Sequence, residues 1–217
     1  RRQHHCRWCT IDNGAGGAGG NTQVGGVAGV NAGNIQETYS LGDVIGISTV
    51  GGLVGENSGT IRDSYSMVAT TGNKVGGLVG KNTGTVDKSY SVGLVTPAGA
   101  KSERPSYGGL VADNIGGTVT ASYWDKDTTG VTTGVGESKE TVDMKMRETF
   151  PTKPLAKKWD FDSIWAIEEG ASASYPYLRN ATQAPIPGFV EYFGGGDGSV
   201  DAPFEIEIWT HLHNIRQ

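Results

Sequence analysis

"VGGLVGENSGTIRDSYS" occupies residues 50–66, and "VGGLVGKNTGTVDKSYS" follows at residues 75–91. Two looser copies flank this pair, "VGGVAGVNAGNIQETYS" at 24–40 and "YGGLVADNIGGTVTASYW" at 107–124. The first three copies start at 24, 50 and 75, so the period is 26 and then 25 residues. The last step is longer because "TPAGAKSERPS" (96–106) is inserted. A fixed period of this length indicates a solenoid, a propeller or another stacked array.

The composition narrows the class of protein. The chain has 217 residues, among them 35 glycines, with a net charge of −5. The glycines lack a strict G-X-Y period, which excludes collagen. The negative charge argues against nucleic acid as a main partner, because phosphate binding needs a basic face. No apolar run approaches the roughly 20 residues of a membrane-spanning helix, so we expect no direct membrane span. The first residue is not Met, which suggests a mature or excised portion of a longer protein.

Aligning the copies separates inward from outward positions. The residue before the repeated asparagine varies freely, which marks an outward position: Val30, Glu56, Lys81 and Asp113. Side chains alternate along a strand, so Leu53, Gly55 and Asn57 are predicted to point inward. The N-x-G that follows supplies a turn with a residue tolerant of positive φ. Spacing leaves open whether a bend precedes Tyr65 and buries Ser64.

The same alternation makes a prediction about a row of valines. Val54, Val79 and Val111 share the parity of Glu56 and Lys81, so they are expected to point outward. A row of exposed valines is unusual on a free surface. We therefore predict that residues 138–180 or a partner cover it.

Stacked coils place equivalent residues above one another at about 4.8 Å. The sequence thus predicts an all-β fold, a parallel, right-handed β-helix of about four coils with a small mixed α/β C-terminal cap. We expect three columns whose role is to hold the stack together: Leu53, Leu78, Leu110; Asn31, Asn57, Asn82, Asn114; and Tyr39, Tyr65, Tyr90, Tyr123.

The repeats resemble a known motif. "GGLVGENSGTI" and "GGLVGKNTGTV", each followed by "SYS", are similar to the GLUG motif, over residues 24–130. The first copy departs from the motif at Ala28 and the fourth at Ala112. The resemblance implies a parallel β-helix in an adhesin-like bacterial or archaeal protein that is secreted or on the cell surface.

The rest of the chain is not repetitive. Residues 1–23 are predicted to form a Gly-rich arm, and 131–184 a cap with a helix at 138–150, starting at Ser138 or Thr141. The physical role of the cap would be to cover the terminal coil with Trp159, Phe161, Trp165 and Tyr177. An aromatic glycan site is the alternative for three tryptophans: Trp124, Trp159 and Trp165.

Cys6 and Cys9 are the only cysteines, in "HHCRWC". A single pair lacks the four ligands of a zinc site, and Thr10 stands where a c-type haem site has histidine. We expect a disulfide or a plain arm, and no metal or cofactor.

Residues 185–217 combine a linker with a strand and a helix that resemble the opening of a further module. Their apolar side chains are a candidate self-assembly interface: Phe204, Ile206, Ile208, Trp209 and Leu212. The tail would cover the first coil of the next copy and generate a head-to-tail filament. The alternative is the start of a tandem module that docks in cis or not at all.

Three classes of function fit a β-helix: a structural or adhesive module, a carbohydrate-binding module, and a polysaccharide-active enzyme. The outward charges alternate in sign instead of concentrating carboxylates, and all four histidines lie in the terminal arms. We expect an extracellular, non-enzymatic structural or adhesive module without catalytic residues. Its partners would be further copies of itself or a ligand on a host or cell surface.

Overall fold

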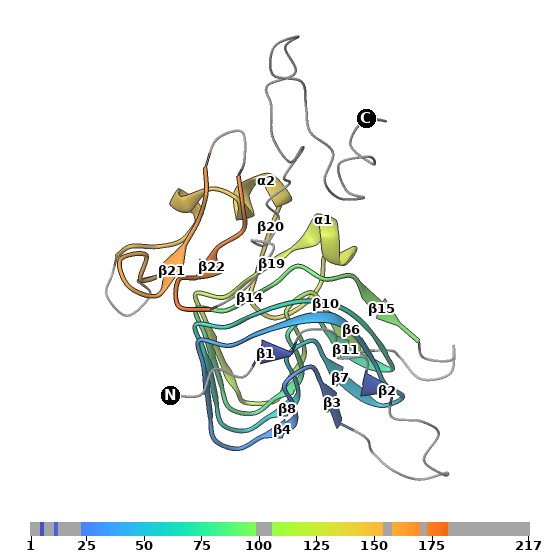
Figure 1. Ribbon diagram of the computed structural model, residues 1–217. Helices are drawn as coiled ribbons and strands as arrows, with labels where there is room; N and C mark the ends of the chain where they lie inside the picture. Colours follow the sequence, from blue (N-terminus) through green and yellow to red (C-terminus); the bar gives the residue numbers. More distant parts are fainter. Residues whose placement is uncertain are drawn as a thin grey trace.

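The computed structural model describes residues 5–6, 11–12, 23–98, 106–153, 158–169 and 173–181. The repeats wind through four parallel sheets, which we call A to D, and each turn of the chain adds one strand to sheets B, C and D and at least one strand to sheet A (Figure 1). Sheets B, C and D have four strands each. The predicted parallel β-helix of about four coils is therefore confirmed.

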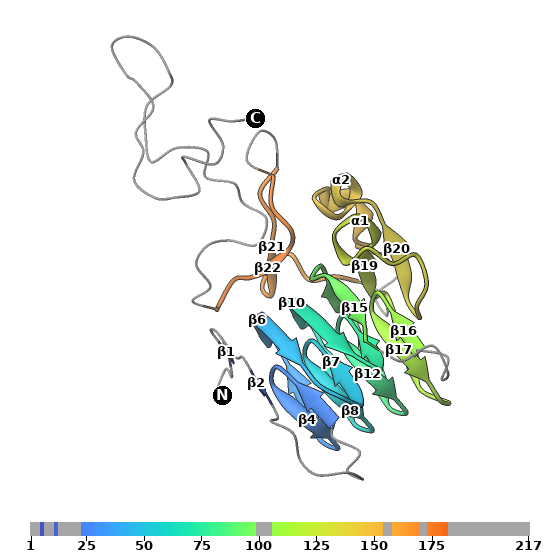
Figure 2. The ribbon, with the colours of Figure 1, turned by 90° about the vertical axis from the view of Figure 1, so that its right-hand side faces the viewer.

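Three sheets are built only from the repeats, and their strands lie side by side in coil order (Figure 2). Sheet B holds β3 (Gln23–Gly25), β7 (Thr49–Gly51), β11 (Lys74–Gly76) and β16 (Ser106–Gly108). Sheet C holds β4 (Ala28–Asn31), β8 (Val54–Asn57), β12 (Val79–Asn82) and β17 (Val111–Asn114). Sheet D holds β5 (Asn34–Gln36), β9 (Thr60–Arg62), β13 (Thr85–Asp87) and β18 (Thr118–Thr120).

Sheet A is larger and extends past the repeats at both ends. It contains β1 (His5–Cys6), β2 (Ile11–Asp12), β6 (Tyr39–Ile45), β10 (Tyr65–Gly72), β14 (Tyr90–Ser91), β15 (Val95–Pro97), β19 (Tyr123–Asp125) and β20 (Glu137–Lys139). β1 and β2 both pair with β6 in parallel. Part of the predicted N-terminal arm is therefore an edge of sheet A.

The interior is filled by two clusters of apolar side chains. Valines from sheets A and B, among them Val50 and Val68, form one cluster together with Val131. The other contains Leu53, Ile61 and their equivalents in later coils. Equivalent residues of adjacent coils are in register, so each cluster runs the length of the stack.

Each coil bends sharply between sheets D and A. The residue at this corner has a positive φ in every coil: Glu37 at 49°, Asp63 at 46°, Lys88 at 47° and Ala121 at 44°. The bend turns Ser64 inward, where it is fully buried and its Oγ accepts a hydrogen bond from Thr38 N at 3.2 Å. The bend that spacing left open is thus present.

The glycine of the N-x-G turn has the predicted positive φ in the fourth copy, where Gly116 has a φ of 72°, and a different conformation in the first three copies. Gly33, Gly59 and Gly84 are absent from the residues with positive φ. A Cβ on Gly59 would instead lie 2.1 Å from the carbonyl oxygen of Gly33 in the coil below, and one on Gly84 would lie 2.1 Å from that of Gly59. At Gly59 and Gly84 glycine is therefore needed because adjacent coils touch backbone to backbone at this corner.

The outward orientation predicted for Val54, Val79 and Val111 is wrong. All three are fully buried, in the same interior cluster as Leu53. The prediction assumed that one face of β8 meets solvent, whereas both faces are covered at its start. A Cβ on Gly55 would lie 2.7 Å from the backbone nitrogen of Val24 in sheet B, so that face has no access to water. The cover is the solenoid itself, not residues 138–180.

After β19 the chain forms α1 (Lys126–Thr129), α2 (Thr141–Met144), the 3₁₀ helix η1 (Arg147–Thr149), and the antiparallel pair β21 (Trp165–Ala166) and β22 (Tyr177–Leu178). The single helix predicted at 138–150 is therefore wrong. Met144 and Phe150 are both buried in the same cluster. In a continuous helix their side chains would point about 120° apart, so the chain breaks into short turns to bury both.

Candidate functional surfaces

The predicted asparagine column is a continuous ladder of hydrogen bonds. Each side chain donates from Nδ2 to Oδ1 in the next coil, at 2.7 Å from Asn31 to Asn57, 2.8 Å from Asn57 to Asn82 and 2.7 Å from Asn82 to Asn114. Asn57 Nδ2 also reaches the carbonyl oxygen of Gly59 at 3.3 Å. The side-chain amides are thus used to hold adjacent coils together.

The predicted leucine column is also present. Leu53, Leu78 and Leu110 are fully buried. Leu53 N donates to Leu78 O, and Leu78 N donates to Leu110 O, each at 2.9 Å. The column therefore lies inside the core and offers no surface.

The tyrosine column lies on the outer face of sheet A. Val68 points into the interior, so Tyr65, three residues earlier on the same strand, points the other way. The Tyr39 and Tyr65 rings stack at 5.3 Å, and the Tyr65 and Tyr90 rings at 5.0 Å. Tyr123 instead meets Phe150 edge-on at 5.5 Å.

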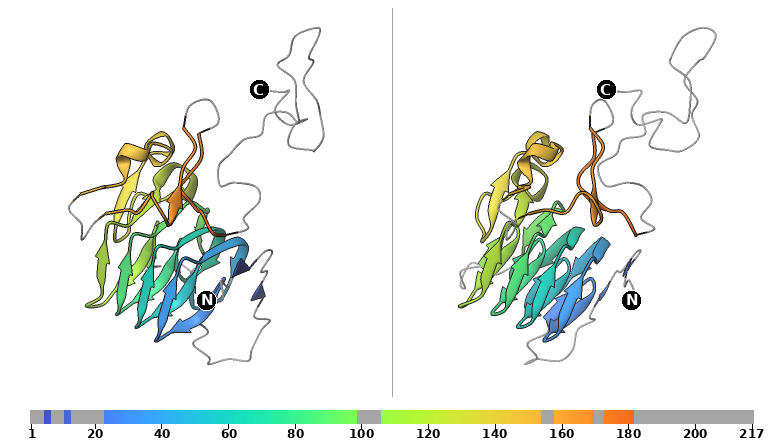
Figure 3. Two further views of the ribbon diagram at one scale, coloured as in Figure 1. Left: turned by 60° about the vertical axis from the view of Figure 1, so that its left-hand side comes forward. Right: turned by 90° about the vertical axis from the view of Figure 1, so that its left-hand side faces the viewer.

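Residues 140–153, 158–169 and 173–181, which we call the strap, cover this column. The ring of Phe150 lies near Tyr123, Trp159 lies 6.4 Å from Tyr90, and Trp165 lies 6.2 Å from Tyr65. From Phe150 to Trp165 the strap thus runs back from the last coil toward the first (Figure 3), and Tyr175 then lies 6.3 Å from Tyr90. The predicted cap therefore covers the tyrosines on the side of the stack, and other residues cover the end of the stack.

Hydrogen bonds fix the strap to the solenoid. Tyr90 OH donates to Pro176 O at 2.5 Å, and Trp159 Nε1 donates to Ala121 O at 2.9 Å. Burial raises the pKa of Tyr65 and that of Tyr90 well above 10.0, and the pKa of Tyr123 to about 12. These phenols therefore stay neutral and act as packing groups and hydrogen-bond donors.

Asp63 connects the strap to the corner between sheets D and A. Its side chain is buried, and Trp165 Nε1 donates to its Oδ1 at 3.3 Å. Arg62 Nε lies 3.0 Å from its Oδ2. Burial raises the pKa of Asp63 above 3.8, and the hydrogen bond from Trp165 and the charge of Arg62 partly oppose the shift.

Asp125 joins the last coil to the strap. Its Oδ1 accepts hydrogen bonds from the backbone of Asp127 and Thr128, which caps α1. Its Oδ2 accepts from Thr141 Oγ1 at 2.7 Å and from Tyr175 OH at 2.5 Å. All of these donors satisfy a fully buried carboxylate, so Asp125 is a structural junction.

The three tryptophans considered for glycan binding are all buried. Trp124 takes the inward position that Ser91 holds in the previous coil, and its Nε1 donates to Val131 O at 3.1 Å. It fills the end of the interior and is the end cover that the strap does not provide. Trp159 and Trp165 lie beneath the strap and present no ring face to a sugar.

The outward charges form ion pairs between coils. Lys81 Nζ lies 2.7 Å from Glu56 Oε1, and Lys74 Nζ lies 2.5 Å from Asp113 Oδ2. The hydrogen bond from Lys81 lowers the pKa of Glu56, and Glu56 raises the pKa of Lys81. Such solvent-accessible pairs contribute little to stability. They neutralise each other along the stack and leave no concentrated charge on this face.

Some predicted sites lie outside the described residues. These include Cys9 and all five candidates for the self-assembly interface, from Phe204 to Leu212. Within the described ranges, no group of three or more His, Cys, Asp or Glu side chains has the geometry of a metal site. The same ranges contain no helix long and apolar enough to cross a membrane.

The alignment of the four repeats did not predict one surface feature, a pocket beside Tyr107. A signal was present, because the fourth copy reads "YGG" where the first three read "VGG". Tyrosine at an otherwise buried valine position indicates that the last coil differs locally from the others.

Comparison with known proteins shows similarity over part of the chain. No protein-family model matches the chain, and no solved structure matches it. A protein of Evansella cellulosilytica named "Putative Gly-rich membrane protein" is 45% identical over 75 residues. The match covers 32% of this chain and only 8% of that protein. The chain is thus similar to a small part of a much longer Gly-rich protein.

Proposed function

We propose that this chain is a non-enzymatic structural and adhesive module of an extracellular or cell-surface protein, built from GLUG-type coils. The asparagine ladder carries the proposal. It uses the most regular polar side chains of the repeats for contacts between coils, at 2.7–2.8 Å throughout. The tyrosines and leucines are buried in the same way. A chain that devotes its repeated residues to a long, stiff stack suits a scaffold or a stalk.

The similarity to a longer protein supports this reading. The relative is named as a Gly-rich membrane protein, and the matched segment is a small fraction of its length. A surface location follows for this chain if it likewise belongs to a large Gly-rich protein. The stack would then hold the other parts of its own parent protein away from the cell.

The first coil provides a surface for assembly. Among the described strands, β3, β4 and β5 each pair on one side only. Val30 in β4 is 56% exposed, and Ile35 is half-buried whereas its equivalent Ile61 is fully buried. Unpaired strand edges with apolar side chains are templates for another strand. We propose that residues 191–217 of one copy add to this edge of the next copy, which makes a head-to-tail filament.

Negative-stain electron microscopy and sedimentation velocity test this assembly. The full chain should form filaments whose length increases with protein concentration. A variant that lacks residues 191–217 should remain folded by circular dichroism and lose the filaments. If the shortened protein assembles as before, or the full chain stays monodisperse at high concentration, the head-to-tail proposal is wrong.

A further inference from the structure

The last coil leaves a gap in sheet A. β6 and β10 continue to Ile45 and Gly72, whereas β19 stops at Asp125, where the chain turns into α1. β15 consequently pairs with β10 on one side and has no described strand on the other. The space above β15 is filled only in part, by the segment that follows α1.

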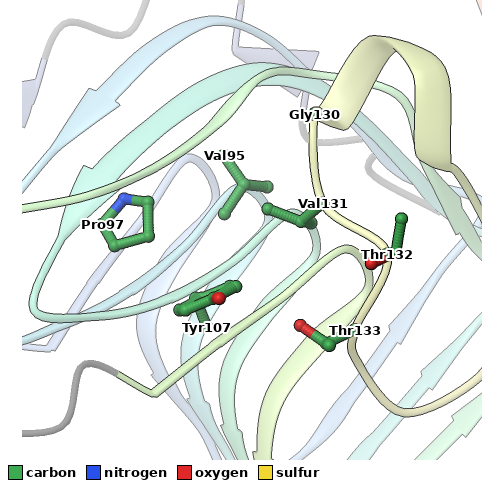
Figure 4. A pocket seen from close by; sticks show the side chains of 7 residues that line it. All are labelled: Val95, Pro97, Tyr107, Gly130, Val131, Thr132 and Thr133. Atoms are coloured by element: carbon green, nitrogen blue, oxygen red, sulfur yellow. The ribbon is translucent and has the colours of Figure 1, made fainter.

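A pocket with a volume of about 330 Å³ occupies this space. It is lined by Val95, Pro97, Tyr107 and the segment 130–133. In Figure 4, Tyr107 lies at the base, Pro97 on one side, and Thr132 and Thr133 on the other. The volume is at the lower end of the range for small-molecule sites, and it suits a ligand of about one ring.

Tyr107 is the residue that distinguishes this place from the rest of the stack. It is in register with Val75, which is in register with Val50 and Val24. Those three valines are buried between sheets A and B, whereas Tyr107 is 39% exposed. A flat aromatic face therefore stands where the other coils have a closed core.

The lining selects a class of ligand. None of the seven lining residues carries a charge, so the pocket has no recognition group for a phosphate, a carboxylate or an amine. Val95, Pro97, Val131 and the ring of Tyr107 provide apolar contact. Tyr107, Thr132 and Thr133 are exposed side chains that carry hydroxyl groups, which can exchange hydrogen bonds with a ligand.

We propose that this pocket binds a neutral pyranose unit of a glycan. The C–H face of the sugar would stack on Tyr107, and its hydroxyls would exchange hydrogen bonds with the two threonines. A sugar has both an apolar C–H face and hydroxyls, so it matches the mixed lining of apolar side chains and threonine hydroxyls better than a wholly apolar peptide side chain does. This pocket would be the ligand-binding site of the adhesive module proposed above, so its role in adhesion rests on that proposed function. Its chemistry can be tested separately from assembly.

The test is a titration of the full chain with cellotetraose, mannotetraose and chitotetraose, each followed by backbone amide NMR at a protein concentration at which sedimentation velocity shows the monomer. We expect saturable shifts at Tyr107 and at residues 131–133 with at least one of the three, with a dissociation constant of about a millimolar. Tyr107→Ala should weaken binding about tenfold or more, and Tyr107→Phe much less, because it keeps the stacking face. Ile115→Ala, at another exposed apolar side chain, is the matched control and should have no effect.

Three results would overturn the proposal. One is the absence of saturable shifts at these amides with all three sugars. Another is binding that Tyr107→Ala leaves unchanged while circular dichroism shows that the variant is folded. The third is a set of nuclear Overhauser contacts in the sugar-free protein that place side chains of residues 99–105 inside the pocket, which would show that the chain fills its own site. Assembly is measured separately, by sedimentation. If the full chain forms no filaments but still binds a sugar, the head-to-tail proposal is rejected and the sugar site is kept.

Discussion

Replacement of Asn57 by alanine tests whether the asparagine ladder holds the coils together. Asn57 is fully buried and takes part in two ladder bonds, as acceptor from Asn31 at 2.7 Å and as donor to Asn82 at 2.8 Å. The loss of two neutral hydrogen bonds costs about 1 kcal/mol each, and the stranded Oδ1 of buried Asn82 adds about 1–3 kcal/mol. The free energy of unfolding should therefore fall by about 3–5 kcal/mol.

Asn114→Ala is the matched control, because it makes the same chemical change at the accepting end of the ladder and strands no buried Oδ1. Asn114 is half-buried and takes part in one ladder bond, as acceptor from Asn82, whose Nδ2 keeps the carbonyl oxygen of Gly84; its loss should cost about 1–2 kcal/mol. Urea unfolding followed by tryptophan fluorescence measures both variants on the same chain. Equal losses in the two variants, or a loss below about 1 kcal/mol for Asn57→Ala, would refute the ladder as a source of stability.

Two further predictions concern the corners of the coils. Gly59→Ala should lower the free energy of unfolding by about 1–3 kcal/mol, because the new Cβ meets the carbonyl oxygen of Gly33. Gly33→Ala is the control: no atom lies nearer than 3.9 Å to its Cβ, so the free energy of unfolding should change by less than about 0.5 kcal/mol. Equal effects of the two substitutions in urea unfolding would contradict the close approach of the coils. Asp63→Asn should alter the pH dependence of stability. Burial raises the pKa of Asp63 above 3.8, so the folded state holds that proton more tightly and loses stability as pH rises through the folded pKa. The stability of Asp63→Asn minus that of the wild type should thus increase from about pH 4 upward and then level off; a flat difference between pH 3.5 and 7 would show that Asp63 is not perturbed.

The sequence was sufficient to predict the ladders because each ladder residue recurs once in every coil. Asn57 and Asn82 occupy the same place in nearly identical stretches, and a stack is the arrangement that brings copies of one residue into contact. The register that follows from the alignment is the one observed.

The orientation of individual side chains was harder to predict. Val54 was placed outside because alternation was counted back from Glu56, on the assumption that one face of the strand meets water. Sheet C packs on sheet B through glycine, so near Gly55 both faces are covered and alternation no longer separates inside from outside.

The position of the strap could not be predicted, because its aromatic residues occur once each and no period fixes their partners. Trp165 and Tyr65 are in contact although they are far apart in the sequence. The pattern showed that Trp159 and Trp165 needed a surface to cover, and it gave no means to decide between the end of the stack and the tyrosine column. The pocket beside Tyr107 was missed for a related reason, since it exists only where β19 ends early.

The strap changes how the stack should respond to force. In a simple solenoid each coil touches only its neighbours, so coils can peel away one after another. Here the Trp165–Asp63 hydrogen bond joins residues 102 positions apart, and the Tyr90–Pro176 bond joins residues 86 apart. A coil in the middle of the stack cannot leave before the strap detaches from the tyrosines. Stretched between its ends, the protein should rupture as one cooperative unit, with a single force peak in place of a series of small ones.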